Sequence, residues 1–92
     1  MNPHKYRKTK ILTEVFLGKK IKVVRSSDIS KQGIKGIIEN ETKNMFVIIT
    51  KDGKKKVPKK ECVFEIEINN IYEQVIGKDI CYNLHDRIKK FA

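Results

Sequence analysis

The chain has 92 residues, 39% of them hydrophobic, and its 21 lysines and arginines against 11 aspartates and glutamates give a net charge of +10. This length predicts one domain with a modest core, and no apolar run reaches the roughly 20 residues of a transmembrane helix. The N-terminal residues contain no apolar stretch that fits a secretory signal, so we expect a cytoplasmic protein. The positive charge favours a polyanionic partner (RNA, DNA or anionic lipid), although a basic domain without such a partner also fits the composition.

The basic residues are almost all lysines, since only Arg7, Arg25 and Arg87 are arginines. Lysine neutralises a phosphate as a point charge and reads base edges less well than arginine does. The composition therefore indicates contact with a nucleic-acid backbone more than base readout. Cys62 and Cys81 form no Cys-x-x-Cys pair, so we expect reduced, buried cysteines and no zinc site.

Residues 1–8 are polar and basic, and we expect a flexible arm there, followed by a single domain over residues 9–92. The first element of that domain is a short amphipathic helix over residues 9–17, which Gly18 ends. Its apolar face consists of Ile11, Leu12, Val15 and Phe16. Two turns of helix are unstable alone, so this face must dock either on the chain's own domain or on a protein partner.

After Gly18 the hydrophobic period becomes two, which is typical of half-buried strands. Strands are expected at residues 20–23, 34–39, 45–50, 63–68 and 71–76, with a further strand after the hairpin signal Asp52-Gly53. Pro58 restricts that further strand to a sheet edge or a strand end. Glycines 33 and 36 indicate a bulge or a sharp bend, as small barrels need at their corners.

A second short helix is expected at the C-terminal end. Asn83 is a candidate N-cap, and Leu84, Ile88 and Phe91 fall on one helical face. Short strands with turn residues between them, and a helix at each end, predict a mostly β protein with a small closed or nearly closed antiparallel barrel.

Positive charge is concentrated in two segments, while most of the acidic residues lie elsewhere. The first strand carries Lys19, Lys20, Lys22 and Arg25; the hairpin carries Lys51, Lys54, Lys55, Lys56, Lys59 and Lys60. Segregated charge creates a face with a strong field, which predicts a surface that follows a phosphate backbone. The alternative is a solvated strand face whose lysines prevent edge-to-edge aggregation.

Two loops could add contacts. Ser26 and Ser27 offer hydroxyl groups to phosphates or ribose 2′-hydroxyls, although serines are also ordinary turn formers. Lys43 lies at the tip of a turn from which it could reach RNA. Tyr6, Tyr72 and Tyr82 are the few candidates for base stacking, so we expect recognition of structured RNA rather than stacking on single bases.

No pattern indicates catalysis by the chain itself. A supported Ser-His-Asp or Cys-His arrangement is missing from the sequence, as is a glycine-rich phosphate loop. We therefore predict no catalytic residues, no metal-binding residues and no bound cofactor.

Several positions match a known family at fixed spacing. Arg25-Ser26-Ser27-Asp28, Ser30, Gly33-Ile34-x-Gly36 and Glu41-Thr42-Lys43-Asn44 resemble the archaeal ribonuclease P protein component 1 family, the counterpart of a eukaryotic ribonuclease P and MRP subunit. The resemblance extends from about Leu17 to Arg87. Near its end the family often has Arg-Pro-Glu-Asp-Arg, of which only Asp86 and Arg87 match here.

The resemblance implies an Sm-like, SH3-like barrel and a non-catalytic, RNA-binding subunit of ribonuclease P. In that holoenzyme the RNA subunit uses Mg²⁺ to remove the 5′ leader from precursor tRNA. The implied partners are the specificity domain of ribonuclease P RNA, a small zinc-ribbon protein subunit, other ribonuclease P proteins and, indirectly, precursor tRNA. The zinc-ribbon subunit would bind partly through the N-terminal helix with its face of Ile11, Leu12, Val15 and Phe16.

Together, the charge pattern and the resemblance predict one set of RNA-binding residues. These are Lys20, Lys22, Arg25, Ser26, Ser27, Lys31, Lys43, Lys54, Lys55, Lys56, Lys59, Lys60 and Arg87. The main alternative is a generic basic barrel that binds DNA or ribosomal RNA. An SH3-type peptide adaptor is a weaker alternative, because the chain has no tryptophan for an aromatic groove.

Overall fold

The structure is a computed structural model that describes residues 9–92, so the arm predicted at residues 1–8 lies outside the described part of the chain. The strands are β1 (Lys20–Ser26), β2 (Lys35–Glu41), β3 (Met45–Thr50), β4 (Gly53–Pro58), β5 (Cys62–Ile68) and β6 (Ile71–Ile76). The helices are four 3₁₀ helices, η1 (Thr9–Thr13), η2 (Ile29–Lys31), η3 (Lys59–Glu61) and η4 (Gly77–Ile80), and one α-helix, α1 (Leu84–Phe91).

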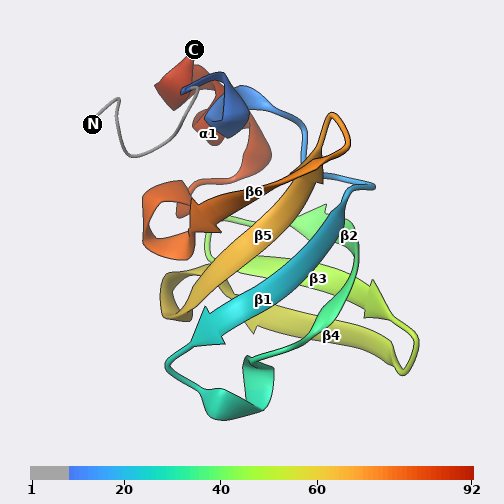
Figure 1. Ribbon diagram of the computed structural model, residues 1–92. Helices are drawn as coiled ribbons and strands as arrows, with labels where there is room; N and C mark the ends of the chain where they lie inside the picture. The colour runs from blue at the N-terminus through green and yellow to red at the C-terminus, as the bar shows by residue number, and fades with distance from the viewer. Residues whose placement is uncertain (1–8) are drawn as a thin grey trace.

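The six strands form one antiparallel sheet in the order β4-β3-β2-β1-β5-β6. The sheet curls so that β1, β5 and β6 pass across β2, β3 and β4 (Figure 1). Register shifts after Val23 in β1 and after Ile38 in β2 mark the bends, as expected where a bulge increases local twist. The predicted mostly β, barrel-like fold is confirmed, with β4 and β6 as the two edges of a barrel that remains open between them.

The core fills the inside of the curled sheet. Strand β5 shows the clearest alternation, since every second residue from Cys62 to Ile68 is buried, as a strand with one face on a core requires. Phe46 lies at the centre, with its ring packed edge-to-face against Phe64 at 5.2 Å and against Phe16 at 6.2 Å between centroids. Phe16 comes from the N-terminal segment, so that segment completes the core.

The N-terminal helix prediction is wrong in its extent. Of the two roles left open for its apolar face, the structure supports docking on the chain's own domain and not the protein-partner role for most of the face. The helix is a 3₁₀ turn over Thr9–Thr13 instead of a helix to residue 17. Three of the four apolar residues, Ile11, Leu12 and Phe16, are at most 5% exposed within the chain's own core, while Val15 is 50% exposed. A segment too short to be stable alone is therefore held by docking on its own barrel.

Two strands extend beyond the predicted ends because their neighbours offer further partners. Strand β1 continues to Ser26, which pairs with Cys62 of β5. Strand β2 continues to Glu41, which pairs with Phe46 of β3. Gly36 lies within β2, where a Cβ would overlap the carbonyl oxygen of Ile49, so the close approach of β2 and β3 requires glycine.

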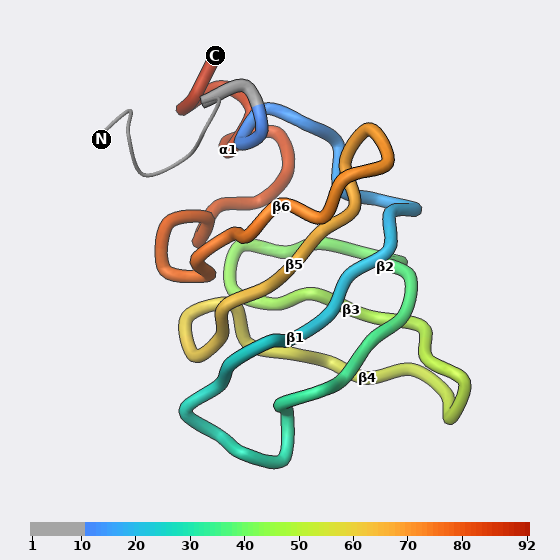
Figure 2. Tube along the Cα trace, viewed as in Figure 1, coloured from blue at the N-terminus to red at the C-terminus, as the bar shows by residue number. Residues whose placement is uncertain are grey.

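The C-terminal helix is confirmed, together with its predicted N-cap. The Asn83 side chain accepts a hydrogen bond from the Asp86 backbone N–H at 2.8 Å, as an N-cap does. Helix α1 packs beside η1 at one end of the barrel, and η2 lies at the opposite end (Figures 1 and 2). Among residues 9–92, no helix combines the length and the apolar character needed to cross a membrane.

Candidate nucleic-acid interface

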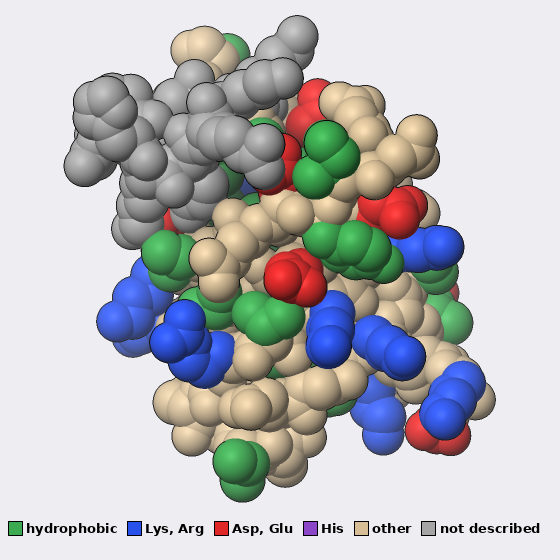
Figure 3. Space-filling model, in the orientation of Figure 1, with side chains coloured by type: hydrophobic (Ala, Val, Ile, Leu, Met, Phe, Trp, Pro, Cys, Tyr) green, Lys and Arg blue, Asp and Glu red, His purple; other side chains and the backbone are tan. Residues whose placement is uncertain are grey.

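A groove on the outer face of the sheet gathers lysines from β1, β2 and the β3–β4 hairpin. It has a volume of about 900 Å³. Its basic residues are Lys20, Lys22, Lys35, Lys51 and Lys55, all exposed, and its acidic residues are Asp52 and Glu65. We call it the lysine groove. In the space-filling view, Lys and Arg side chains gather over β1, β2 and the hairpin (Figure 3).

Strand geometry explains how these lysines come together. In β1, Ile21 and Val23 face the core, so the alternating Lys20 and Lys22 point outward. The register then places Lys22 opposite Lys35 of β2 on one side and opposite Glu65 of β5 on the other. Residues far apart in the sequence thus form one continuous charged row.

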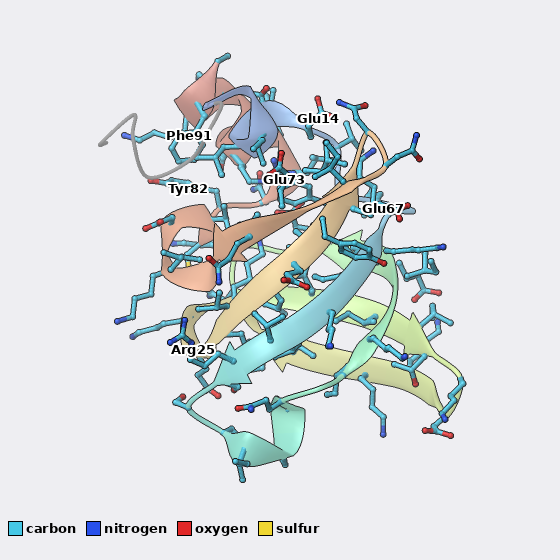
Figure 4. All side chains as sticks on the ribbon, viewed as in Figure 1. Glu14, Arg25, Glu67, Glu73, Tyr82 and Phe91 are labelled. Carbon is cyan, nitrogen blue, oxygen red and sulfur yellow. The ribbon has the colours of Figure 1, made fainter. Side chains whose placement is uncertain are left out.

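A second, smaller groove lies at the end of β1 and beside η3 and η4. It has a volume of about 350 Å³. Its polar lining is Arg25, Ser26, Ser27, Lys60, Glu61 and Lys78, and we call it the Arg25 groove. Figure 4 shows Arg25 at the end of the barrel away from α1. The Arg25 groove joins four of the predicted residues, Arg25, Ser26, Ser27 and Lys60.

The serine loop after β1 is largely engaged in its own structure. Ser26 Oγ accepts a hydrogen bond from the Asp28 backbone N–H at 3.1 Å. The Asp28 carboxylate accepts from Ser30 Oγ at 2.7 Å and from the Ser30 N–H at 3.0 Å, and these two bonds lower the pKa of Asp28. The turn-forming alternative therefore accounts for Ser26 and Asp28, and Ser27 keeps its exposed side chain.

The remaining predicted lysines lie outside both grooves. Lys54 and Lys56 are exposed on the edge strand β4, where Lys54 pairs with Glu39 at 3.0 Å. Lys43 is exposed on the β2–β3 turn, and Lys31 is partly buried in η2. An exposed pair such as Lys54–Glu39 adds little stability.

Two of the predicted RNA-binding residues, Lys59 and Arg87, are buried, so their assignment to the RNA-binding surface is wrong. Both are 0% exposed. With Glu41, whose side chain is also fully buried, they form what we call the buried ion cluster. Glu41 Oε2 accepts from Lys59 Nζ at 2.8 Å and from Arg87 Nε at 3.0 Å, while Oε1 accepts from Arg87 Nη2 at 3.0 Å.

Backbone carbonyls complete the coordination of the two cations. Lys59 Nζ also donates to the carbonyl oxygens of Thr42, Ile80 and Tyr82 at 2.7 to 3.0 Å. Arg87 Nη1 donates to the Leu12 carbonyl at 2.6 Å. These bonds connect η1, α1, η4 and the β2–β3 turn at one place in the core. They also give the buried charges the partners that such charges require.

Aromatic rings close the buried ion cluster on its apolar side. The Arg87 guanidinium lies 3.8 Å from the Phe16 ring centroid, and Lys59 Nζ lies 4.9 Å from that of Phe46. Burial lowers the pKa of Lys59, and the hydrogen bond to Glu41 acts in the opposite direction. The side chains of the cluster are fully buried, so the cluster holds the helical end of the molecule onto the barrel and does not contact a ligand.

The predicted set of RNA-binding residues omitted three lysines that line the grooves, Lys35, Lys51 and Lys78, although Lys51 had been counted in the basic hairpin. Lys35 had a usable signal, because the alternation around Gly36 in β2 places it on the face away from the core. The burial of Arg87 also had a usable signal in the sequence, because Arg87 lies three residues after Leu84 and four before Phe91, on the apolar face of α1. Lys78 gave none, since η4 has no hydrophobic period.

The curled sheet and the grooves on its outer face define a small basic β-barrel protein. Residues 9–90 match the model of the family "Ribonuclease P/MRP, subunit p29". The chain is 39% identical over 84 residues to ribonuclease P protein subunit p29 of Rattus norvegicus, covering 89% of this chain and 38% of the rat protein. It is 35% identical over 78 residues to ribonuclease P protein component 1 of Nitrosopumilus maritimus, covering 85% of this chain and 89% of that one.

A solved structure agrees with the sequence matches. It is that of Mth11, described as a homologue of the human RNase P protein Rpp29, with a TM-score of 0.60 and 27% identity over 82% of this chain and 99% of that chain. The chain belongs to the ribonuclease P/MRP subunit p29 family, which includes the archaeal component 1 proteins, and the resemblance seen in the sequence is confirmed. It spans well under half the length of the mammalian relatives that it matches.

Proposed function

We propose that this chain is a non-catalytic, RNA-binding subunit of ribonuclease P that supports RNA-catalysed removal of the 5′ leader from precursor tRNA. The observation that carries the proposal is the lysine groove, in which five exposed lysines outnumber two acidic residues. The match to proteins named as ribonuclease P subunits indicates which RNA the groove would bind. Mg²⁺ serves the catalytic RNA in this proposal, and the chain contributes no ligand to it.

The lysine groove supports the binding of a phosphate backbone. Ammonium groups that neutralise phosphates release condensed counterions, so binding strengthens at low salt. By screening repulsion between phosphates, the subunit would stabilise the folded RNA and lower its demand for Mg²⁺. The specificity domain of ribonuclease P RNA is the partner that the family resemblance implies.

A zinc-ribbon protein subunit would have less apolar surface to meet than the sequence indicated. Ile11, Leu12 and Phe16 are buried in the barrel, but Val15 and Leu17 are 50% and 40% exposed. We propose these two residues as the contact that the N-terminal segment offers to such a subunit. Only the buried Phe16 separates them in the chain, and exposed apolar side chains grouped in this way are suited to an interface.

The test is reconstituted cleavage of precursor tRNA at low Mg²⁺, using an archaeal ribonuclease P RNA and the other protein subunits, with and without this chain. We expect the chain to increase cleavage. The triple variant Lys22→Ala, Lys35→Ala, Lys55→Ala should blunt that increase, because it removes three charges from the lysine groove.

A control variant removes positive charge outside the lysine groove. The double variant Lys89→Ala, Lys90→Ala takes two exposed lysines from α1 and should retain the increase in cleavage. If the wild-type chain gives no increase but binds duplex DNA or ribosomal RNA tightly, the generic basic barrel replaces the ribonuclease P subunit as the explanation.

A further inference from the structure

The lysine groove has an apolar floor between its charged walls. Ile34, Ile37 and Tyr72 line it together with the lysines, and Gly33 contributes no side chain that would fill it. Tyr72 is 48% exposed and Ile37 is 39% exposed. A purely electrostatic surface for phosphates needs no such floor, so the floor indicates a ligand with an apolar face as well as negative charge.

The sheet register places the Tyr72 ring beside the charged row. Tyr72 of β6 lies opposite Glu67 of β5, two residues from Glu65. Glu65 in turn lies opposite Lys22 of β1. Neighbouring strands are about 4.8 Å apart, and residues along a strand are about 3.3 Å apart. Two strands across and two residues along therefore place Tyr72 and Lys22 roughly 12 Å apart on the same outer face, a separation that one nucleotide and an extended lysine side chain can bridge.

Two lysines of the groove lie so close together that an anion could bind between them. Lys22 and Lys35 are directly opposite each other in the antiparallel register, and like charges in that position destabilise a sheet. Among residues 11–92, the ion pairs include those of Lys54 with Glu39 and of Glu41 with Lys59 and Arg87, and none of them involves Lys22 or Lys35. A phosphate between them would relieve their repulsion.

We propose that the lysine groove binds an unpaired segment of ribonuclease P RNA, with one base stacked on Tyr72 and its neighbouring phosphates held by Lys22 and Lys35. This proposal rests on the proposed function and narrows its ligand. It replaces the sequence-based expectation that bases are not stacked, because the groove brings Tyr72 and the lysines together. Every base has a π-face that can stack on an aromatic ring, and lysines can follow the backbone of a single strand. In an A-form duplex the base faces are stacked inside the helix, where the Tyr72 ring cannot reach them.

The first experiment compares two labelled probes by fluorescence anisotropy: an oligouridylate of eight nucleotides and a blunt RNA duplex of eight base pairs. We expect the wild-type chain to prefer the oligouridylate. Tyr72→Ala should weaken oligouridylate binding about tenfold, within the range for loss of one base–aromatic stack, with little effect on the duplex. Tyr72→Phe keeps the ring and should retain affinity within about twofold.

The second experiment tests the charge. Lys22→Ala and Lys35→Ala should each weaken oligouridylate binding and reduce the slope of log affinity against log salt by about 0.7. Lys90→Ala removes one exposed lysine from α1 and serves as the matched control, with no change in slope. Thermal unfolding followed by circular dichroism establishes that each variant is folded.

The third experiment identifies which RNA occupies the groove. Ribonuclease P RNA carrying 4-thiouridine, assembled with the full set of subunits, should crosslink to the peptide that contains Tyr72, at an unpaired nucleotide. Crosslinks to precursor tRNA instead of to ribonuclease P RNA would overturn the assignment of the ligand.

The inference and the proposed function fail in different ways. Equal affinity of wild type and Tyr72→Ala for the oligouridylate, or no saturable oligouridylate binding at low salt, overturns the inference even if the chain increases cleavage. A chain that binds the oligouridylate through Tyr72 but gives no increase in cleavage overturns the proposed function and, with it, the assignment of the groove to ribonuclease P RNA.

Discussion

Lys55 and Lys59 lie four residues apart in the same lysine-rich segment, yet they belong to opposite kinds of environment. Lys55 is exposed on the lysine groove, while Lys59 is fully buried between Glu41 and three backbone carbonyls. An exposed charge leaves the fold almost unaffected and remains available to a ligand. A buried one is committed to the fold, because its loss leaves polar partners unsatisfied. Charge density in the sequence therefore marks a basic protein but does not say which lysines bind RNA.

The largest expected effect comes from breaking the buried ion cluster at its only acid. Glu41→Gln leaves the charges of Lys59 and Arg87 without a counterion, and we expect it to destabilise the protein by about 3–5 kcal/mol. Urea denaturation measures this. Glu39→Gln is the matched control, since Glu39 lies on the same strand and pairs with an exposed lysine, and it should cost at most about 1 kcal/mol. Equal losses in the two variants would mean that the buried ion cluster does not stabilise the fold.

A smaller effect is expected where η4 packs against the backbone of the buried lysine. A Cβ at Gly77 would overlap the Lys59 carbonyl oxygen, so Gly77→Ala must displace η4 or η3. We expect a loss of about 2 kcal/mol or more in denaturation experiments. Lys78→Ala, at the exposed neighbouring position, should fall within about 0.5 kcal/mol of wild type. A stable Gly77→Ala variant would show that η4 moves freely relative to Lys59.

Loss of the exposed Lys55 should weaken RNA binding without changing the stability of the fold. Lys55→Gln should change the free energy of unfolding by no more than about 0.5 kcal/mol. It should also reduce the salt slope of binding to ribonuclease P RNA by about 0.7 to 0.9, the contribution of one phosphate contact. Filter binding over a range of salt concentrations measures the slope. An unchanged slope would remove Lys55 from the interface.

The smallest effect concerns the buried thiol at the Arg25 groove. Burial raises the pKa of Cys62 above its usual 9.0, so the folded state retains a proton that the unfolded state loses above pH 9. Its contribution to stability is therefore fully present below pH 9 and decreases as the pH rises beyond it. Denaturation midpoints should fall more between pH 8 and pH 10 for wild type than for Cys62→Ser. The same fall in both proteins would contradict the prediction.

Local patterns were enough to predict most of the sheet. The alternation of β5, the bounds of β3 and β6, Pro58 at the end of an edge strand and the Asn83 cap of α1 all agree with the structure. Alternation, turn residues and caps act over a few neighbouring residues, so the sequence displays them directly. The N-terminal segment did not form the predicted helix, because its apolar residues are placed by the shape of the barrel core and not by a helical period.

The sequence by itself determined that the protein is basic, mostly β and similar to one family, and it placed Lys20, Lys22 and Lys55 among the candidates for RNA contact. Only the tertiary structure decided which charges are exposed and which are buried. Arg87 meets Glu41 across 46 positions of the chain, and Lys59 meets it across 18. The lysine groove likewise forms where β6, β5, β1 and β2 come into register and bring Tyr72 toward Lys22 and Lys35. Burial depends on how distant segments pack, and no local pattern of residues encodes it.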